Sequence, residues 1–492
     1  MEQLMKRSTV AALAATTTCL GLVATGTAVA APAQTGPSTT TSPYVQTVRP
    51  GVVTKSVLTV GDRVGDYRLA GTPDGLGAYD NGDGTFTLVM NHEFGATSGV
   101  VRDHGAAGAF ISKWTVEKGS LRVRSGEDLV QQVKSWNGTA WENITTAFNR
   151  MCSADLADVS AFYDAATGKG TQTRIFLNGE EAGSEGRALA HVVDGPDAGT
   201  SYILPWLGKA SWENVVAMPN TGDKTVVVGL DDSGGGQVYV YVGDKKSTGN
   251  DVERAGLTGG TLYGLAIDGV AAENDATTVG SGAGFRLIEI PAAAGLSGAQ
   301  LEAKSKELGV SALARPEDGA WDPTNPGGFY FATTASFTGI SRLWHLDFAD
   351  AADVTAGGRA TIAVASPAYD ATKPQAEQEG PRMMDNITVN DRGQVLMQED
   401  PGGNDYLAGV FQYDPTTGGA ARIARFDAKR FAPGAANFIT RDEESSGIIP
   451  VPFLGAGKYL FTAQVHAKTG DPETVEQGQL ALLSVPPGQP VR

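Results

Sequence analysis

Residues 385–400 read "DNITVNDRGQVLMQED", two short β-prone runs joined by a polar turn and followed by two acids. A turn of Asn, Asp and Gly between such runs is typical of a β-hairpin. The same order recurs five more times along the chain. The other copies are "GAYDNGDGTFTLVMNHE" (77–93), "AFYDAATGKGTQTRIFLNGEE" (161–181), "NVVAMPNTGDKTVVVGLDD" (214–232), "DGAWDPTNPGGFYFATT" (318–334) and "GIIPVPFLGAGKYLFTAQVH" (447–466).

Most copies are followed by another alternating segment, such as "AFISKWTV" (109–116) and "GQVYVYVG" (236–243). Three or four strands per repeat, repeated six times, are the pattern of blades arranged around an axis. We therefore predict an all-β fold, a β-propeller of about six blades with inserted loops. A β-sandwich or a pair of β domains is the alternative.

The N-terminus has the pattern of an export signal. A basic start is followed by an Ala-rich apolar run and by "AVAAPA" (28–33), a small-residue cleavage site. We predict a signal peptide over 1–30 with cleavage near Ala30, a flexible tail over 31–50, and a single propeller domain over 51–492. The protein is then expected to be secreted, and no later run is long enough for an integral-membrane span. We also expect a monomer.

The chain has 492 residues and a formal net charge of −17 at pH 7. A surface this acidic disfavours binding to nucleic acid or to anionic membranes. An anionic substrate would need cations supplied at the site. Cys152 is the only cysteine after the predicted signal peptide, so it is a small buried residue, a metal ligand or a reactive thiol.

Acids recur where the second strand of each hairpin ends. These ends read His92-Glu93, Glu180-Glu181, Asp231-Asp232, Thr333-Thr334, Glu399-Asp400 and Gln464-Val465-His466. Equivalent strands of a propeller end on one face, so carboxylates gathered there would repel one another without a cation. Oxygen-rich clusters select hard cations such as Ca²⁺. We expect a metal site, the alternative being acids that each point into solvent.

A second polar set stands where first strands begin. It comprises Glu213-Asn214, Arg315-Pro316-Glu317-Asp318 and Asp385-Asn386. First strands line the channel of a propeller, so this set is expected to surround a central site. The sequence leaves open whether this set shares one face with the acids at the second-strand ends; the strand directions oppose it unless the connecting loops fold inward.

Arg315 and Glu317 flank a proline that favours extended backbone at Arg315. Residues two apart in a strand face the same side, which places a guanidinium fork beside a carboxylate. Such a fork suits bidentate contact with phosphate oxygens. An Arg–Glu ion pair that braces a turn is the alternative interpretation.

Several of these motifs, in this order, resemble the PhoX-type secreted alkaline phosphatases. They are "NHE" (91–93), the cysteine of "RMCSADL" (150–156), "NGEE" (178–181), "WEN" (212–214), "RPEDGAWDP" (315–323), the hairpin at 385–400 and "SSGIIPVPFLGAGKYLFTAQVH" (445–466). The resemblance spans about residues 75–470. It implies a six-bladed propeller, a site that holds calcium and iron ions, and hydrolysis of phosphomonoesters.

The resemblance also implies roles for single residues. Arg315 would bind the substrate phosphate and act in catalysis with Glu317, which would also ligate metal. Glu93 would be a metal ligand, Cys152 would bind iron (Fe³⁺) as a thiolate, and Glu213 would bridge metals. The further metal-binding candidates are Asp385, Asn386, Glu180, Glu181, Glu399 and Asp400.

The sequence departs from the family at two points. "SADL" follows Cys152 where the family has Gly-Gly, and only Lys113 and Lys169 are candidates for the family's phosphate-binding lysine. The predicted function is a secreted, metal-dependent phosphomonoesterase of the alkaline phosphatase type, acting on a small phosphoester. Another metal-dependent propeller hydrolase (a lactonase or phytase-like esterase) and a non-catalytic, calcium-stabilised binding module are the alternatives.

Overall fold

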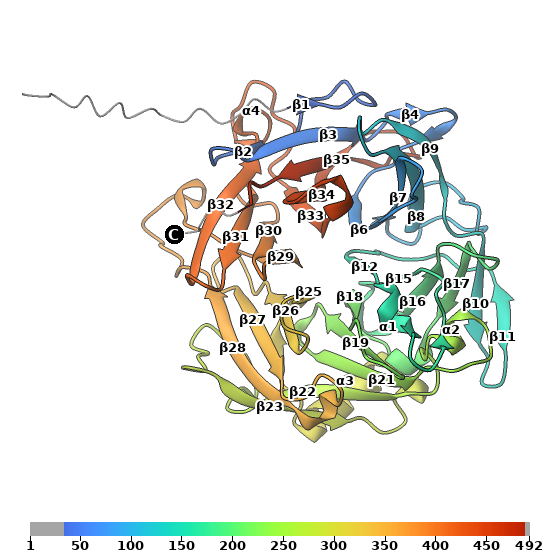
Figure 1. Ribbon diagram of the computed structural model, residues 1–492. Helices are drawn as coiled ribbons and strands as arrows, with labels where there is room; N and C mark the ends of the chain where they lie inside the picture. The colour runs from blue at the N-terminus through green and yellow to red at the C-terminus, as the bar shows by residue number, and fades with distance from the viewer. Residues whose placement is uncertain (1–33, 488–492) are drawn as a thin grey trace, which may run out of the picture.

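The computed structural model describes residues 34–487, which form six β-sheet blades in a ring around a central channel (Figure 1). The predicted signal peptide lies outside the described residues. The all-β propeller of six blades is confirmed. Within residues 34–487 no helix is long and apolar enough to cross a membrane.

The six blades follow one another along the chain. Blade 1 contains β6 (Pro73–Asp80), β7 (Thr85–His92), β8 (Phe110–Glu117) and β9 (Val123–Asp128). Blade 2 contains β12 (Ala154–Leu156), β15 (Ile175–Gly179), β16 (Ala188–Val192) and β17 (Thr200–Ile203), and it is extended by β10 (Gln132–Trp136) and β11 (Trp141–Ile144). Blade 3 contains β18 (Trp212–Ala217), β19 (Lys224–Asp231), β21 (Val238–Asp244), β22 (Thr261–Ile267) and β23 (Ala283–Glu289). Blade 4 contains β25 (Pro316–Trp321), β26 (Gly328–Thr333), β27 (Arg342–Phe348) and β28 (Gly358–Ala365).

Blades 5 and 6 contain strands from both ends of the described chain. They are β29 (Met384–Val389), β30 (Val395–Glu399), β31 (Gly409–Asp414) and β32 (Gly419–Phe426) with β2 (Val45–Thr47), then β33 (Glu443–Pro450), β34 (Lys458–Lys468) and β35 (Glu476–Ser484) with β3 (Val53–Thr59) and β1 (Gln34–Thr35). The short elements are β4 (Arg63–Val64), β5 (Tyr67–Arg68), β13 (Tyr163–Asp164), β14 (Lys169–Gly170), β20 (Gly234–Gly236), β24 (Leu313–Ala314), α1 (Val159–Phe162), α2 (Asp251–Arg254), α3 (Gly298–Leu308) and α4 (Ala428–Phe431).

The innermost strands form a closed ring. Each of β6, β12, β18, β25, β29 and β33 contacts the next, and β33 contacts β6. Pairing of β23 with β28 joins blades 3 and 4 into one nine-stranded sheet. The channel is therefore lined by strands from every blade.

The hairpin at 385–400 shows why the repeat folds as it does. Val389 pairs with Val395 across a turn in which Gly393 has a φ of +73°, a conformation that glycine adopts readily. Ile387 and Met397 pair directly and are buried against blade 4, beside Tyr330. Apolar packing between adjacent blades thus supplies the core that no single blade has.

The expected flexible tail is wrong from residue 34 onward. β2 pairs with β32 in blade 5 and β1 pairs with β3 at the edge of blade 6, so residues of the predicted tail extend both blades. Tyr44 and Val45 are buried in an apolar cluster, and the Tyr44 N–H donates to Gln479 Oε1 at 2.8 Å. Strands from both ends of the chain in one sheet close the ring, a contact that local composition does not reveal.

Candidate metal centre

The beginnings of first strands and the ends of second strands lie at the same end of the channel. In blade 5, Met384 pairs with Glu399, which places Asp385 and Asp400 at one end of the hairpin. In blade 1, Pro73 pairs with His92, next to Asp74 and Glu93. The two polar sets therefore share one face, which the sequence left open, because antiparallel pairing returns the second strand to the start of the first.

One position recurs at the inner ends of the blades. The second residue of the innermost strand is acidic in all six blades, but in blade 2 it is Asp155, which accepts from the Ala217 N–H, and Cys152 stands two residues before β12. The acids of the other five blades are Asp74, Glu213, Glu317, Asp385 and Glu444. Together with Cys152 they are called the inner ring below.

A left-handed residue precedes the inner ring in four blades, two positions before the ring residue. These residues are Thr72 (φ 41°), Arg150 (φ 49°), Arg315 (φ 61°) and Met383 (φ 45°). Left-handed backbone costs a non-glycine residue about 1–2 kcal/mol, and such strain collects at functional sites. The expected extended backbone at Arg315 is therefore wrong, although Arg315 Nη2 still lies 3.2 Å from Glu317 Oε1.

Three groups of potential ligand atoms occur around the ring within residues 34–487. In each group the atoms lie within 4.8 Å of one another. The groups are Asp74, Glu93 and Cys152; Cys152, Glu181 and Glu213; and Glu213, Glu317 and Asp385. Cys152 and Glu213 each belong to two groups, so the three form one continuous series.

Protein contacts tie this series together across the channel. The Ser153 hydroxyl donates to Glu213 Oε1 at 2.7 Å and accepts from Asn386 Nδ2 at 2.5 Å. Residues of blades 2, 3 and 5 thus meet beneath the ring. The Cys152 thiol lies 3.3 Å from Glu181 Oε2.

Several buried oxygen atoms at this end have no hydrogen-bond donor among the described residues. They are Asp74 Oδ1, Asn386 Oδ1 and Gln464 Oε1; Glu317 Oε1 also accepts no hydrogen bond, although it forms the ion pair with Arg315 Nη2. Buried acceptors are almost always paired, because an unpaired one costs about 1–3 kcal/mol. Oxygen atoms without donors, next to a thiol, fit metal cations better than they fit the protein alone.

The electrostatics point the same way. Burial, with the neighbouring carboxylates, raises the pKa of Asp74, Glu213 and Asp385 well above its ordinary range. Burial likewise raises the pKa of Glu317 well above that range and the pKa of Glu181 to about 8. These groups hold protons that a cation would replace.

Burial also raises the pKa of the Cys152 thiol, and that of Asp400 to about 7. Burial alone would lower the pKa of His466, but Glu444 and Glu476 outweigh it and raise this pKa to about 11. His466 is therefore an imidazolium beside the ring, with Nδ1 2.9 Å from Glu476 Oε2.

Two arginines accompany the ring. Arg315 donates from Nε and Nη2 to the two oxygens of Asp232, both at 2.7 Å. Arg150 donates from Nε to Glu93 Oε1 at 2.8 Å and also bonds Glu181. Their side chains are 35% and 48% exposed, so both guanidinium groups face the open side of the cluster.

Neither lysine that the sequence suggested lies among these groups. Lys113 pairs with Glu127 on β8 and β9, and Lys169 pairs with Asp223 on the surface. Arg150 is a cation beside the ligand groups that the sequence did not suggest. Its position two residues before Cys152 matches that of Arg315 before Glu317.

Four of the predicted ligands lie outside the three groups, namely Glu180, Glu399, Asp400 and Asn386. Glu180 is engaged by Arg187 and by the Asn149 N–H, and Glu399 accepts from the Arg382 N–H, the Gly409 N–H and the Tyr406 hydroxyl. Their oxygens already have protein donors, so we do not carry these two residues forward as ligands. Asp400 and Asn386 lie beside the ring.

Sequence reasoning missed Asp74, Glu444 and Arg150, and it named Asp232 only as an acid at a strand end, not as a partner of Arg315. Strand position was the signal that could have found the two acids of the inner ring, because each inner-ring acid is the second residue of an innermost strand. Asp74 and Glu444 precede the quoted hairpin copies by three residues, because those copies were started inside the strands.

The chain is similar to known phosphatases in both sequence and structure. A family model described as "Alkaline phosphatase PhoX" matches residues 195–463, more than half of the chain. Among solved structures, Pseudomonas fluorescens PhoX in complex with vanadate, a transition state analogue, matches with a TM-score of 0.59 at 13% identity, over 92% of this chain and 97% of that one. No curated protein matches the sequence.

Two other structures are only loosely similar. A gluconolactonase from Xanthomonas campestris has a TM-score of 0.32 at 11% identity, over 89% of this chain and 100% of that one. Chaetomium thermophilum Sqt1 bound to the N-terminus of ribosomal protein L10 has a TM-score of 0.38 at 9% identity, over 88% and 99%.

The fold and the family match define a metal-dependent phosphatase-type hydrolase built on a six-bladed propeller. The chain belongs to the PhoX alkaline phosphatase family.

Proposed function

We propose that the protein is a secreted phosphomonoesterase that uses calcium and iron ions. One observation carries this proposal: the inner ring presents buried oxygens without donors, and a guanidinium that contacts one of its acids stands beside it. Export rests on the N-terminal pattern of the sequence. The substrate is then a small phosphate monoester.

The ligand atoms suggest how two kinds of metal would be held. Asp74, Glu93, Glu213, Glu317 and Asp385 offer carboxylate oxygens, the donors that Ca²⁺ prefers. Cys152 offers a thiolate, a soft ligand that suits iron rather than calcium. Bound cations supply positive charge and Lewis acidity to a phosphate ester.

Arg315 is suited to hold the phosphate. Asp232 accepts from Nε and Nη2, which fixes the plane of the guanidinium, and no hydrogen bond within residues 34–487 uses Nη1. A group fixed in this way offers its remaining N–H bonds to phosphate oxygens without having to reorganise. Arg315 would bind and orient the phosphate and stabilise the charge that develops on its oxygens.

Arg150 supplies a second positive charge on the same open side. It is held by Glu93 and Glu181, and these acids would be neutralised when cations bind among them. Its charge then becomes available to the anionic substrate. Two arginines and bound cations thus explain how a protein with net charge −17 attracts a phosphate dianion.

The test is an assay of the purified protein with p-nitrophenyl phosphate and bis(p-nitrophenyl) phosphate at alkaline pH. Calcium is supplied, and bound metals are measured by mass spectrometry. Turnover of the monoester with calcium and iron bound supports the proposal. Calcium binding and calcium-dependent stability without ester turnover would overturn it and favour a binding module, and turnover of a lactone alone would favour a lactonase.

A further inference from the structure

A buried ion pair lies behind Arg315, between blades 3 and 4. Glu273 belongs to the loop between β22 and β23, and Arg342 begins β27. Their side chains are 0% and 2% exposed, and Arg342 Nη1 lies 2.9 Å from Glu273 Oε1. None of the inner-ring residues is part of this pair, so the metal centre does not account for it.

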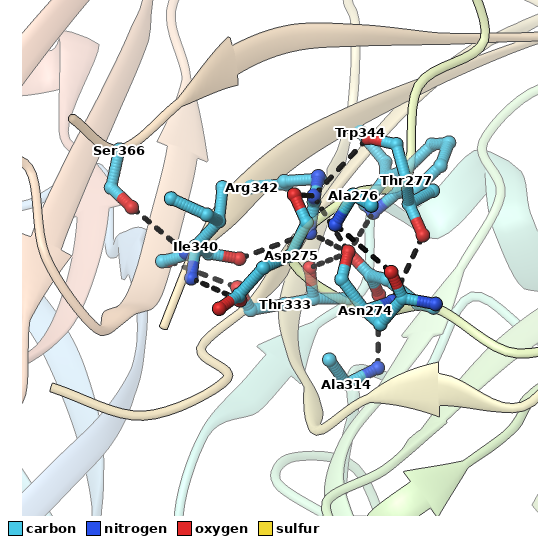
Figure 2. Close-up of polar contacts among 12 residues, drawn as sticks. Asn274, Asp275, Ala276, Thr277, Ala314, Thr333, Ile340, Arg342, Trp344 and Ser366 are labelled. Carbon is cyan, nitrogen blue, oxygen red and sulfur yellow. Dashed lines mark hydrogen bonds and ion pairs between the residues drawn. The ribbon is translucent and has the colours of Figure 1, made fainter. Parts of the chain in front are cut away.

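Arg342 is fully engaged by the loop that carries Glu273. Its Nη2 donates to the carbonyls of Asn274, Asp275 and Thr277, and its Nη1 also donates to Ile340. Figure 2 shows these groups gathered around the guanidinium. Ile340 N–H in turn donates to the Asp275 carboxylate at 2.9 Å. The loop is thereby fixed on blade 4.

The Glu273 carboxylate contacts both the residue before Arg315 and the end of β26. Its Oε2 accepts from the Ala314 N–H at 2.9 Å, and its Oε1 accepts from the Thr333 hydroxyl at 3.0 Å. Trp344 Nε1 also donates to Oε1, at 3.3 Å. Ala314, Thr333, Arg342 and Trp344 point toward one place in Figure 2.

The backbone around Arg315 is held on either side of that contact. The Thr334 N–H donates to the Arg315 carbonyl at 3.0 Å, and the Ala335 N–H donates to the Ala314 carbonyl at 2.9 Å. β24, which ends at Ala314, pairs with β20, which follows Asp232. Arg315 therefore keeps its left-handed φ of 61° because its neighbours are fixed.

We propose that Glu273 is a positioning residue for Arg315. Its buried charge, held in place by Arg342, fixes the Ala314 N–H and so sets the direction from which the Arg315 guanidinium faces the metal centre. This inference rests on the proposed phosphate-binding role of Arg315. Without Glu273, the strained backbone would relax and the fork would no longer meet the phosphate.

The test is Glu273→Gln in the metal-loaded, full-length protein. We expect KM for p-nitrophenyl phosphate and the inhibition constant of inorganic phosphate to rise about tenfold, the size of one lost hydrogen bond to a charged group. Asp128→Asn is the matched control, since Asp128 also pairs with a buried arginine, Arg102, but in blade 1. It should leave both constants unchanged per folded molecule.

Glu273→Asp covers the case in which the amide variant does not fold. It keeps a negative charge for Arg342 but withdraws the carboxylate from the Ala314 N–H, so both constants should still rise. A merely structural role would lower the folded fraction without moving either constant. Unchanged constants in folded Glu273→Asp or Glu273→Gln would overturn the inference.

A double-variant cycle separates this inference from the function on which it rests. If Glu273 acts through Arg315, Glu273→Gln adds no further weakening to Arg315→Ala. An equal loss on both backgrounds would overturn the positioning role. Unaltered phosphate binding in Arg315→Ala alone would instead overturn the role of Arg315 itself.

Discussion

Replacing Glu181 by glutamine should have opposite effects on stability with and without metal. The Glu181 carboxyl belongs to one of the three ligand groups, and its side chain is 12% exposed. Its ordinary pKa of 4.5 is raised to about 8, chiefly by burial. At pH 7 it is therefore mostly protonated in the folded protein and ionised in the unfolded chain.

This difference sets the expected magnitude. Each unit between pH 4.5 and pH 7 corresponds to about 1.4 kcal/mol, so proton uptake on folding costs roughly 3 kcal/mol at pH 7. Glu181→Gln removes that cost, and its amide oxygen can still accept from the half-exposed Arg150, so the altered contact subtracts at most about 1 kcal/mol. Without metal, the variant should gain about 2 kcal/mol in free energy of unfolding.

With metal bound, the sign reverses because the variant has lost a charged ligand. The assay is urea unfolding at pH 7 in chelator and in excess Ca²⁺. Glu185→Gln is the control, since Glu185 is more than half exposed and pairs with Lys209 on the surface. If Glu181→Gln destabilises the protein equally in chelator and in Ca²⁺, the cation-site reasoning is refuted.

Three other predictions concern the same centre. Arg315→Ala should lower kcat/KM at least 100-fold, and Arg315→Lys should lower it less, since lysine keeps the charge but not the fork. The exposed control Arg286→Ala should stay within twofold of wild type in steady-state kinetics. A value of kcat/KM for Arg315→Ala within the same twofold range would contradict the prediction. Cys152→Ser should reduce bound iron but not calcium in metal analysis, and unchanged iron would exclude the thiolate as its ligand. In chelator, the free energy of unfolding should fall as pH rises from about 5 to 8, because the unfolded chain loses protons that Glu181 (pKa about 8) and Asp400 (pKa about 7) retain in the folded protein. Ca²⁺ should flatten this slope. A free energy of unfolding that rises across this range in urea titrations would contradict the prediction.

The sequence by itself determined the repeating unit and much of the acidic set. The turn "NDRG" and the β-prone runs around it act locally, so the hairpin at 385–400 and its copies could be recognised before their partners were known. Six such units predict a propeller. Glu93, Glu213, Glu317 and Asp385 could be named because each stands at the start or end of a recognisable strand.

Only the tertiary structure decided which of these groups meet. The closed ring brings Asp74 near Cys152, and Cys152 near Glu213, across long separations in sequence. It also removes Glu180 and Glu399 from the candidates by giving their oxygens protein donors. Local patterns carry no record of such long-range pairing, because it depends on the curvature and closure of all six blades.

The backbone conformation at the site is likewise set by tertiary contacts. Pro316 favours extended backbone at Arg315, yet contacts from blades 3 and 4 hold that residue in a left-handed conformation. The segment after residue 33 reads as a loose tail but packs into blades 5 and 6. In both cases fixed neighbours outweigh the local preference, since many buried contacts exceed a local cost of one or two kcal/mol.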